Sequence, residues 1–183
     1  MKGSLVSSSI AEPYAQALMS LARSRDLAER FGEDFRGLER LMEESPELRD
    51  FITNPIIKDE DKKAVIRSIM GEETDSQLVN FLMLLVDKRR IVFLEQVVSQ
   101  YLALLREMNQ VVLAEVISVR ELNQGQRRSV EDKVREISNA RGVELKTTIN
   151  PDIIGGVIIK VGSQILDASL QSQLRRIGMS LNA

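Results

Sequence analysis

The 183-residue sequence contains no cysteine and no histidine. The absence of cysteine excludes disulfide bonds, thiolate metal sites and a cysteine nucleophile. The absence of histidine removes the most common general base and the most common transition-metal ligand. Enzymes can use other groups, but the two absences together favour a binding or structural protein, and we expect no cofactor and no metal.

The sequence also lacks long hydrophobic runs. Its longest apolar stretches, such as 82–86, are far shorter than the roughly 20 residues of a membrane-spanning helix. Residues 1–7 carry one basic residue and no long apolar core, so we expect neither a secretory signal nor a transit peptide.

The sequence has no strong net charge of either sign. The 25 basic and 27 acidic residues give a net charge of −2, which argues against nucleic acid as a partner. The densest basic run, 88–90, lacks interleaved aromatic residues. We interpret this run as solvated or paired with acidic side chains.

Three properties of the sequence change near residue 110. All aromatic residues precede it, runs of β-branched residues are concentrated after it, and the net charge changes from negative to positive. These changes predict an α+β protein with two domains, residues 1–109 and 110–183.

The first domain is predicted to be a bundle of six helices, because apolar residues recur at helical spacing in six segments. Ser9 and Glu12 have the spacing of a capping box, which would place Pro13 near the first turn of the first helix. Ser45 followed by Pro46 predicts the start of the third helix.

The fifth predicted helix, from Asp75 or Ser76 to about Asp87, is apolar nearly all round. Asn80 is the only polar residue in its central turns. Such a helix is buried on most sides, either at the centre of the bundle or between the bundle and a partner. A lone amide is costly there unless something bonds it, which singles out Asn80.

The second domain is predicted to have the order β-α-β-β-β-α. Strand signals cover 111–119, 143–149, 156–161 and 164–167. We expect Gly142 at the C′ position of the helix that follows the first strand of this domain. A hairpin turn is expected at Gly162 and Ser163. One face of the closing helix is expected to carry Leu170, Leu174, Ile177 and Leu181.

Gly155, Gly156 and Gly162 invite comparison with phosphate-binding loops. Their spacing fits neither the dinucleotide-binding fingerprint nor the P-loop. A structural role is favoured, in which paired glycines permit a bulge or a close approach of two backbones. A small enzyme that binds a phosphorylated substrate at Gly155 and Gly156 is the alternative.

Three segments resemble the delta subunit of F-type ATP synthases, the family of the mitochondrial oligomycin-sensitivity-conferring protein. Residues 10–18 are similar to the family's Pro-Tyr-Ala-x-Ala opening, and residues 84–91 to its helix-turn-helix junction. The most specific segment is 143–162. The residues that fit its signature are Val143, Leu145, Ile149, Asn150, Ile153, Gly155, Gly156, Val157, Ile159, Lys160 and Gly162. Residues 166–170 are similar to the closing segment of the family, except that Ala168 stands where the family usually has glycine.

This resemblance implies a non-catalytic stator subunit in the peripheral stalk of a proton-translocating ATP synthase. It implies one copy per complex, with the N-terminal domain on the alpha subunits of the catalytic head and the C-terminal domain on the b-type stalk subunits. Membrane association would be only through the complex. The expected place is the cytoplasmic side of a bacterial plasma membrane or of a cyanobacterial thylakoid, or the stromal side in a plastid. The alternative is a free-standing helical adaptor unrelated to a rotary ATPase.

The resemblance also implies a groove between the first and fifth helices that receives the N-terminal helix of an alpha subunit. The corresponding positions are Tyr14, Ala17, Asn80 and Leu84. Ala17 is small and lets another helix come close, and Asn80 and Leu84 share a helix face. The alternative for Tyr14 and Leu84 is that both belong to the core. The turn and strand of the family signature are represented by Gly155, Gly156, Lys160 and Gly162.

Overall fold

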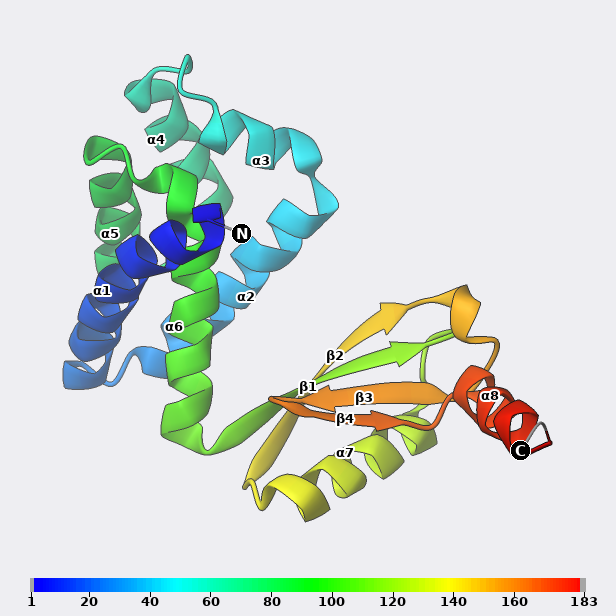
Figure 1. Cartoon of the computed structure of the whole chain (residues 1–183). Helices are drawn as coiled ribbons and strands as arrows, with labels where there is room; N and C mark the ends of the chain where they lie inside the picture. Colours follow the sequence, from blue (N-terminus) through cyan, green and yellow to red (C-terminus); the bar gives the residue numbers. More distant parts are fainter. Residues whose placement is uncertain (1, 182–183) are drawn as a thin grey trace. The chain divides into compact units, whose positions relative to one another are not determined.

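The computed structural model describes residues 2–181, and side chains are described for residues 9–175. The chain divides into two compact units, Met1–Leu105 and Arg106–Ala183. The first consists of helices, and the second combines a sheet with two helices (Figure 1). This arrangement confirms the predicted α+β class.

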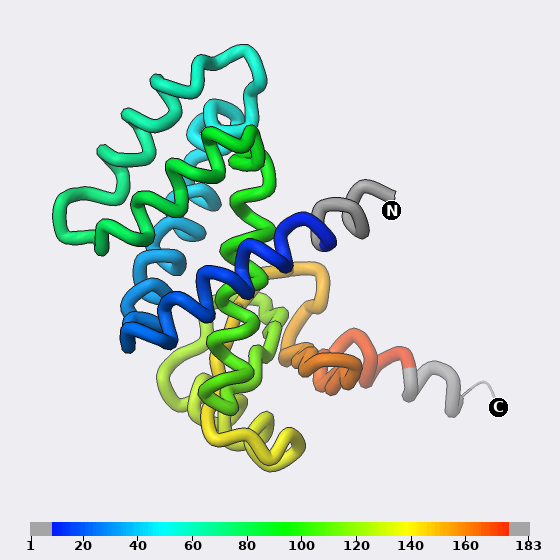
Figure 2. Tube along the Cα trace, turned by 90° about the vertical axis from the view of Figure 1, so that its left-hand side faces the viewer, coloured from blue at the N-terminus to red at the C-terminus, as the bar shows by residue number. Residues whose placement is uncertain are grey.

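Six α-helices and one short 3₁₀ helix make up the described part of the first unit, with α6 running on into the second. They are α1 (Lys2–Ser24), α2 (Ala28–Glu44), α3 (Pro46–Thr53), α4 (Asp59–Met70), α5 (Ser76–Asp87), η1 (Ile91–Phe93) and α6 (Leu94–Asn109). Helices α4 and α5 lie side by side, and α1 crosses α6 obliquely in both views (Figure 1 and Figure 2).

Aromatic side chains fill the centre of the helical unit. Phe31 and Phe35, one turn apart on α2, are fully buried, as is Tyr101 on α6. The rings of Phe35 and Tyr101 meet edge to face with centroids 5.0 Å apart. The Tyr101 hydroxyl donates a hydrogen bond to the carbonyl of Ala28 at 3.1 Å. Burial, and then the nearby Glu29 carboxylate, raise the pKa of Tyr101.

Local signals set most helix ends. The Ser45 hydroxyl accepts a hydrogen bond from the Leu48 N–H at 3.3 Å, with Pro46 at the first position of α3, which confirms the predicted start. Asp75 caps α5 by accepting from the Gln77 N–H at 2.8 Å. Each cap gives a partner to an N–H that the helix itself cannot satisfy.

The prediction for the start of α1 is wrong. The helix begins at Lys2, so Ser9 and Glu12 do not form a capping box, and Pro13 lies inside the helix. A proline removes one backbone hydrogen bond, and here α1 continues through that loss. The spacing of Ser9 and Glu12 matches a cap locally but contains no information about the turns before it.

The second unit contains four strands and two α-helices in the described residues, in the predicted order. They are β1 (Val111–Ser118), α7 (Gln124–Ser138), β2 (Gly142–Ile149), β3 (Val157–Val161), β4 (Gln164–Asp167) and α8 (Leu170–Leu181), with the 3₁₀ helix η2 (Pro151–Ile153) before β3. The sheet has the order β2-β1-β3-β4. Strands β1 and β2 are parallel, and β3 is antiparallel to both of its neighbours.

Helix α7 covers one face of this sheet (Figure 1). Ala114 and Val116 of β1, Ile159 of β3, and Val130 and Val134 of α7 form the buried core between them. The side chains are aliphatic and small, and alternation along β1 turns Glu115 away from this core. The helix therefore leaves the opposite face of the sheet to other contacts.

The end of α7 differs from the prediction. The helix ends at Ser138, with Asn139 at φ 52° as its left-handed cap, and Gly142 is instead the first residue of β2. Asparagine tolerates this backbone conformation because its short polar side chain bonds locally. On α8, Leu170 and Leu174 are both exposed, and the side chains of Ile177 and Leu181 lie outside the described residues.

Candidate functional site: an apolar groove between α1 and α5

An open groove lies between α1 and α5. Its volume is about 460 Å³, and its lining consists of Pro13, Tyr14, Ala17, Leu18, Leu21, Phe81 and Leu84. Every side chain in this set is apolar or aromatic. Three of the four predicted groove residues, Tyr14, Ala17 and Leu84, thus come together, although α1 and α5 are far apart in the sequence.

Leucines at two edges of the groove are unusually accessible. Leu84 is 43% exposed and Leu21 is 36% exposed, whereas Leu82 and Leu85, on the other flank of α5, are fully buried. Helix α5 therefore has one flank in the bundle core and another at the surface. This division accounts for its nearly continuous apolar sequence without making it a fully enclosed helix.

Tyr14 forms one wall of the groove and is held from two sides. Its ring meets the ring of Phe81 edge to face at 6.4 Å between centroids. The Arg90 guanidinium lies 5.3 Å from the centroid of the Tyr14 ring, and Arg90 Nη1 donates a hydrogen bond to the Tyr14 hydroxyl at 3.0 Å. These contacts hold the ring in one orientation.

Ala17 lines the groove and is exposed. A methyl side chain leaves room for the backbone or side chains of another helix at this point. Leu84 is exposed, whereas Tyr14 is half-buried and packs against the core, so the core alternative fits Tyr14 in part and does not fit Leu84.

Asn80 does not line the groove. It is exposed on α5, so water can solvate its amide, and the desolvation cost expected for a buried amide does not arise. Asn80 and Leu84 are one turn apart on the exposed side of α5. A contact between Asn80 and a bound helix stays a prediction.

Sequence reasoning missed five residues of this site. Four line the groove, namely Pro13, Leu18, Leu21 and Phe81, and Arg90 supports Tyr14. The sequence does not distinguish these apolar residues from the other apolar residues of α1 and α5. The contact between Arg90 and Tyr14 joins positions 76 residues apart, so the basic run gave no signal of it.

The signature residues of the second unit have structural contacts. A Cβ on Gly155 would lie 2.6 Å from Cδ1 of Leu170, and the Leu170 N–H donates to the Gly155 carbonyl at 2.9 Å. Gly156 has φ 80°, and a Cβ there would overlap the Ala168 carbonyl oxygen. The chain itself fills the space beside both glycines, in agreement with the close-approach interpretation.

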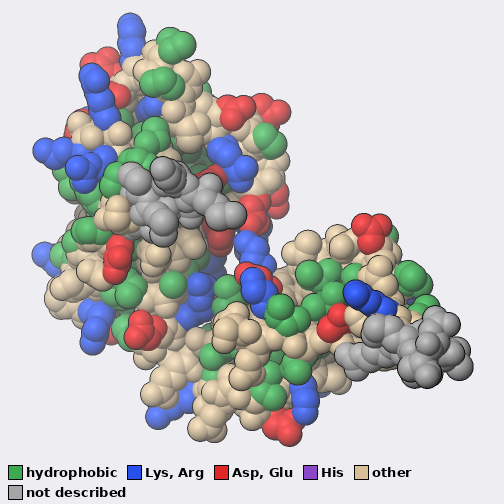
Figure 3. Space-filling view, in the orientation of Figure 1, with side chains coloured by type: hydrophobic (Ala, Val, Ile, Leu, Met, Phe, Trp, Pro, Cys, Tyr) green, Lys and Arg blue, Asp and Glu red, His purple; other side chains and the backbone are tan. Residues whose placement is uncertain are grey.

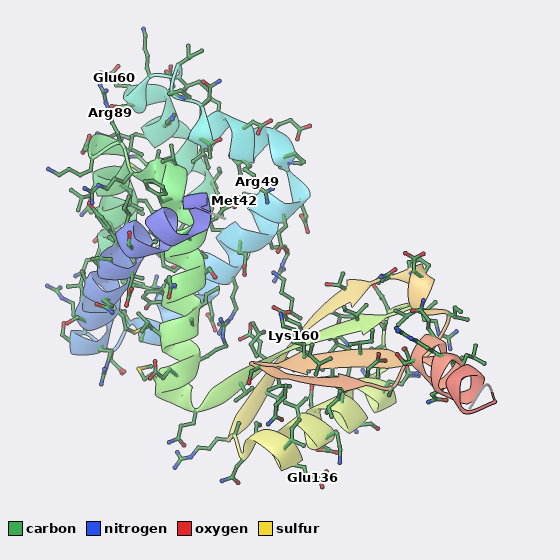
Figure 4. All side chains as sticks on the ribbon, in the orientation of Figure 1. Met42, Arg49, Glu60, Arg89, Glu136 and Lys160 are labelled. Atoms are coloured by element: carbon green, nitrogen blue, oxygen red, sulfur yellow. The ribbon has the colours of Figure 1, made fainter. Side chains whose placement is uncertain are left out.

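The other two signature residues belong to the β3–β4 hairpin. Gly162 has φ 56° in its turn, as the hairpin prediction requires. Lys160 points away from α7 and pairs with Glu115 on the neighbouring strand at 3.2 Å (Figure 4). Since both partners are exposed, this ion pair contributes little to stability.

The structure supplies two further facts about the described residues. Between residues 2 and 181, no helix is long and apolar enough to cross a membrane. In the same part of the chain, no cluster of three or more acidic side chains is placed to hold a metal ion.

Comparison with known proteins gives concordant matches. The family model of the ATP synthase delta (OSCP) subunit matches residues 10–181. The ATP synthase subunit delta of Gloeothece citriformis is 65% identical over 181 residues, which cover 99% of this chain and 98% of that protein. The corresponding subunit of Synechocystis sp. is 54% identical with the same coverage. A chain in the Toxoplasma gondii mitochondrial ATP synthase hexamer has the same fold, with a TM-score of 0.72, 21% identity, and coverage of 94% of this chain and 97% of that one.

The fold and the groove define an adaptor architecture, a helical bundle with an apolar groove followed by a small α+β unit. The family match and the cyanobacterial relatives make the assignment specific. The chain belongs to the ATP synthase delta (OSCP) family, and is a non-catalytic subunit in the peripheral stalk of F-type ATP synthases. The alternatives of a free-standing adaptor and a small enzyme are therefore set aside.

Proposed function

We propose that the chain connects the catalytic head of an F-type ATP synthase to its outer stalk. The helical unit binds an N-terminal helix of an alpha subunit in the groove between α1 and α5. The α+β unit binds the C-terminal ends of the b-type stalk subunits. One copy of the chain per complex then holds the head still while the rotor turns.

The observation that carries this proposal is the apolar groove with its exposed leucines. An amphipathic helix could cover Leu21 and Leu84 and approach the backbone of α1 at Ala17. Tyr14 and Phe81 would provide rigid aromatic surface that loses little conformational entropy on binding. Arg90 lies at the Tyr14 hydroxyl and would offer a cation to a polar residue at the edge of the bound helix.

The exposed apolar residues of the α+β unit support its role at the stalk. They are Ile149, Ile154, Ile165, Leu170 and Leu174. Figure 3 shows hydrophobic side chains on the visible face of this unit, beside charged ones. Ile154 is 63% exposed and has φ 64°, a strained conformation for a β-branched residue, which persists only where the surrounding structure fixes it.

The proposed action is mechanical. A stator must transmit torque without slipping, so slow dissociation matters more than rapid exchange. A buried apolar contact in a preformed groove favours slow dissociation, because separation exposes its whole area to water at once. The cyanobacterial relatives favour a place on the cytoplasmic side of a thylakoid or plasma membrane, reached through the complex.

The groove assignment is tested by titrating the full chain with a peptide of the alpha-subunit N-terminal segment. Replacement of Ala17 by Asp places an unpaired carboxylate in the contact. We expect this variant to weaken binding by roughly 2–4 kcal/mol, because the charge loses its hydration without gaining a partner. Circular dichroism checks that the variant keeps its helices.

Gln16→Asp provides the matched control. Gln16 is exposed on the same helix but does not line the groove, so this variant adds a similar charge away from the contact. We expect its affinity for the peptide to stay within about twofold of the unchanged chain. Equal affinities for Ala17→Asp and Gln16→Asp would remove the groove from the proposal.

A further inference from the structure

A second hollow lies in the helical unit, away from the groove. It has a volume of about 530 Å³ and lies between the loop before α4, the first turns of α4, and the turn that joins α5 to η1. The residues that line it are Pro55, Ile56, Ile57, Lys58, Asp59, Glu60, Lys62, Arg89, Ile91 and Val92. Figure 4 labels Glu60 and Arg89, which lie at the same end of the bundle.

Lys62 makes this hollow unusual. The residue is only 4% exposed, and its side chain forms no hydrogen bond or ion pair with any residue whose side chain is described. Its neighbour Lys63, in contrast, pairs with Asp87. The stem of Lys62 is buried against the protein, and the ammonium group at its end is in contact with water rather than with a carboxylate. The hollow therefore contains a cation that lacks an anionic partner.

The charges around Lys62 favour a singly charged anion. Lys58 and Arg89 add two cations to the wall, and the exposed Asp59 and Glu60 carboxylates oppose them. The three cations and two carboxylates leave the wall with a net charge of +1, which a single carboxylate balances. The acidic residues also balance the dipole at the start of α4, so the helix end alone provides no anion site.

The rest of the wall is apolar and open to water. Ile56 is 88% exposed, and Val92 is also exposed beside the buried Ile91. An exposed isoleucine next to an unpaired cation matches a ligand that carries a carboxylate and apolar groups together. A side chain of Asp or Glu flanked by apolar residues in a protein segment has this chemistry, and its flanking residues can cover Ile56.

We propose that this hollow binds a segment of a partner protein in which an acidic side chain is flanked by apolar ones. The carboxylate pairs with Lys62, with Arg89 beside it, and the flanking residues cover Ile56 and Val92. This contact is separate from the groove between α1 and α5. It would give the helical unit a second attachment, which restrains rotation about the first.

The proposal is tested on the full chain with two capped tripeptides, acetyl-Leu-Glu-Leu-amide and its neutral isostere acetyl-Leu-Gln-Leu-amide. Binding is followed through the methyl NMR signals of Ile56 and Val92. We expect saturable shifts with the Glu peptide and at least tenfold weaker binding of the Gln peptide. Equal binding of the two peptides, or no saturable shift with the Glu peptide, would overturn the proposal.

Butyrate serves as the probe for a free small acid. Because butyrate covers less of Ile56 and Val92, we expect it to bind more weakly than the Glu peptide. Equal or tighter binding of butyrate would overturn the assignment to a protein segment.

Two variants separate the role of Lys62 from that of its surroundings. Lys62→Met keeps the hydrocarbon stem and should reduce the affinity for the Glu peptide to that of the Gln peptide. Lys63→Met removes a neighbouring charge that does not line the hollow, and it should leave the affinity within about twofold. A loss of affinity only in Lys63→Met would contradict the proposal. The comparison of the two peptides on the unchanged chain stands even where a variant fails to fold.

Discussion

The two units of the chain use their apolar residues in different ways. The helical unit has a large core with aromatic residues at its centre, and it leaves part of α1 and α5 uncovered as a groove. The α+β unit has a small aliphatic core under one face of its sheet, and its exposed apolar residues lie on turns, on strands and at the start of α8. The first unit presents a concave apolar surface, and the fold of the second unit depends on close contacts between backbone segments.

This difference predicts where each unit is most sensitive to mutation. A helical bundle tolerates changes on the wall of a groove because its core lies elsewhere. A small sheet unit with a thin core has few contacts to lose, so a single clash between backbone segments affects all of it. Mutations can therefore separate binding from folding in the first unit more easily than in the second.

The largest expected effect is that of Gly156→Ala. A Cβ at this position would overlap the Ala168 carbonyl and approach the Ser169 Cα to 3.0 Å, and φ 80° adds backbone strain. We expect the free energy of unfolding of the α+β unit to fall by about 3 kcal/mol, measured by urea denaturation of the full chain.

Gly162→Asn is the matched control for this prediction. Gly162 also has positive φ, but a Cβ there meets open space, and asparagine tolerates the left-handed region. Its expected effect is below about 1 kcal/mol. An equal loss of stability in both variants would mean that strain, rather than the contact with Ala168, explains Gly156.

Tyr101→Phe comes next and tests the core of the helical unit. The change keeps the contact with Phe35 but removes the hydrogen bond to the buried Ala28 carbonyl. We expect a loss of about 1–2 kcal/mol in the free energy of unfolding, with unchanged binding at the groove. A change in peptide affinity without a change in stability would show that core and groove are not independent.

The smallest effect is expected from Asp34→Asn on α2. Burial raises the pKa of the Asp34 carboxyl, the Arg30 guanidinium partly opposes this rise, and Glu33 and Asp75 reinforce it. Because the pKa is higher in the folded chain, the ionised carboxylate destabilises the fold at neutral pH. Stability is regained as the pH falls through the folded pKa towards 3.8, the value of the unfolded chain.

Asp34→Asn removes this penalty and should stabilise the chain at pH 7 by less than about 1 kcal/mol, since solvent screens a partly exposed group. The gain should disappear below the unfolded pKa. Thermal unfolding of both chains between pH 3 and pH 7 measures the difference. A variant that is less stable at pH 7 than the unchanged chain would contradict this account of Asp34.

Local features of the sequence predicted most of the fold. The helical spacing of apolar residues in the first unit, the cap at Ser45 and the hairpin at Gly162 depend on residues close together in the chain. The start of α1 was missed because a capping pattern at Ser9 says nothing about the residues before it. The end of α7 was missed because Asn139, rather than a glycine, has the left-handed conformation.

The candidate groove could be predicted only in part. The resemblance pointed to Tyr14, Ala17 and Leu84, and these residues do lie together. The exposure of Asn80 and the contact of Arg90 with Tyr14 depend on how α1 and α5 pack, which no local pattern contains. The contact of Gly156 with Ala168 likewise arises only when α8 starts beside the signature turn.

The most direct test of the central claim is a cross-link from the groove to the proposed helix. The chain has no cysteine, so Leu84→Cys introduces a single thiol at the groove, and Ser99→Cys introduces one at an exposed position on α6. Each variant is oxidised together with an alpha-subunit N-terminal peptide that carries one cysteine. The account predicts a disulfide with Leu84→Cys that excess cysteine-free peptide suppresses, and little with Ser99→Cys. Equal cross-linking of both variants, or none with Leu84→Cys under conditions where the peptide binds, would contradict it.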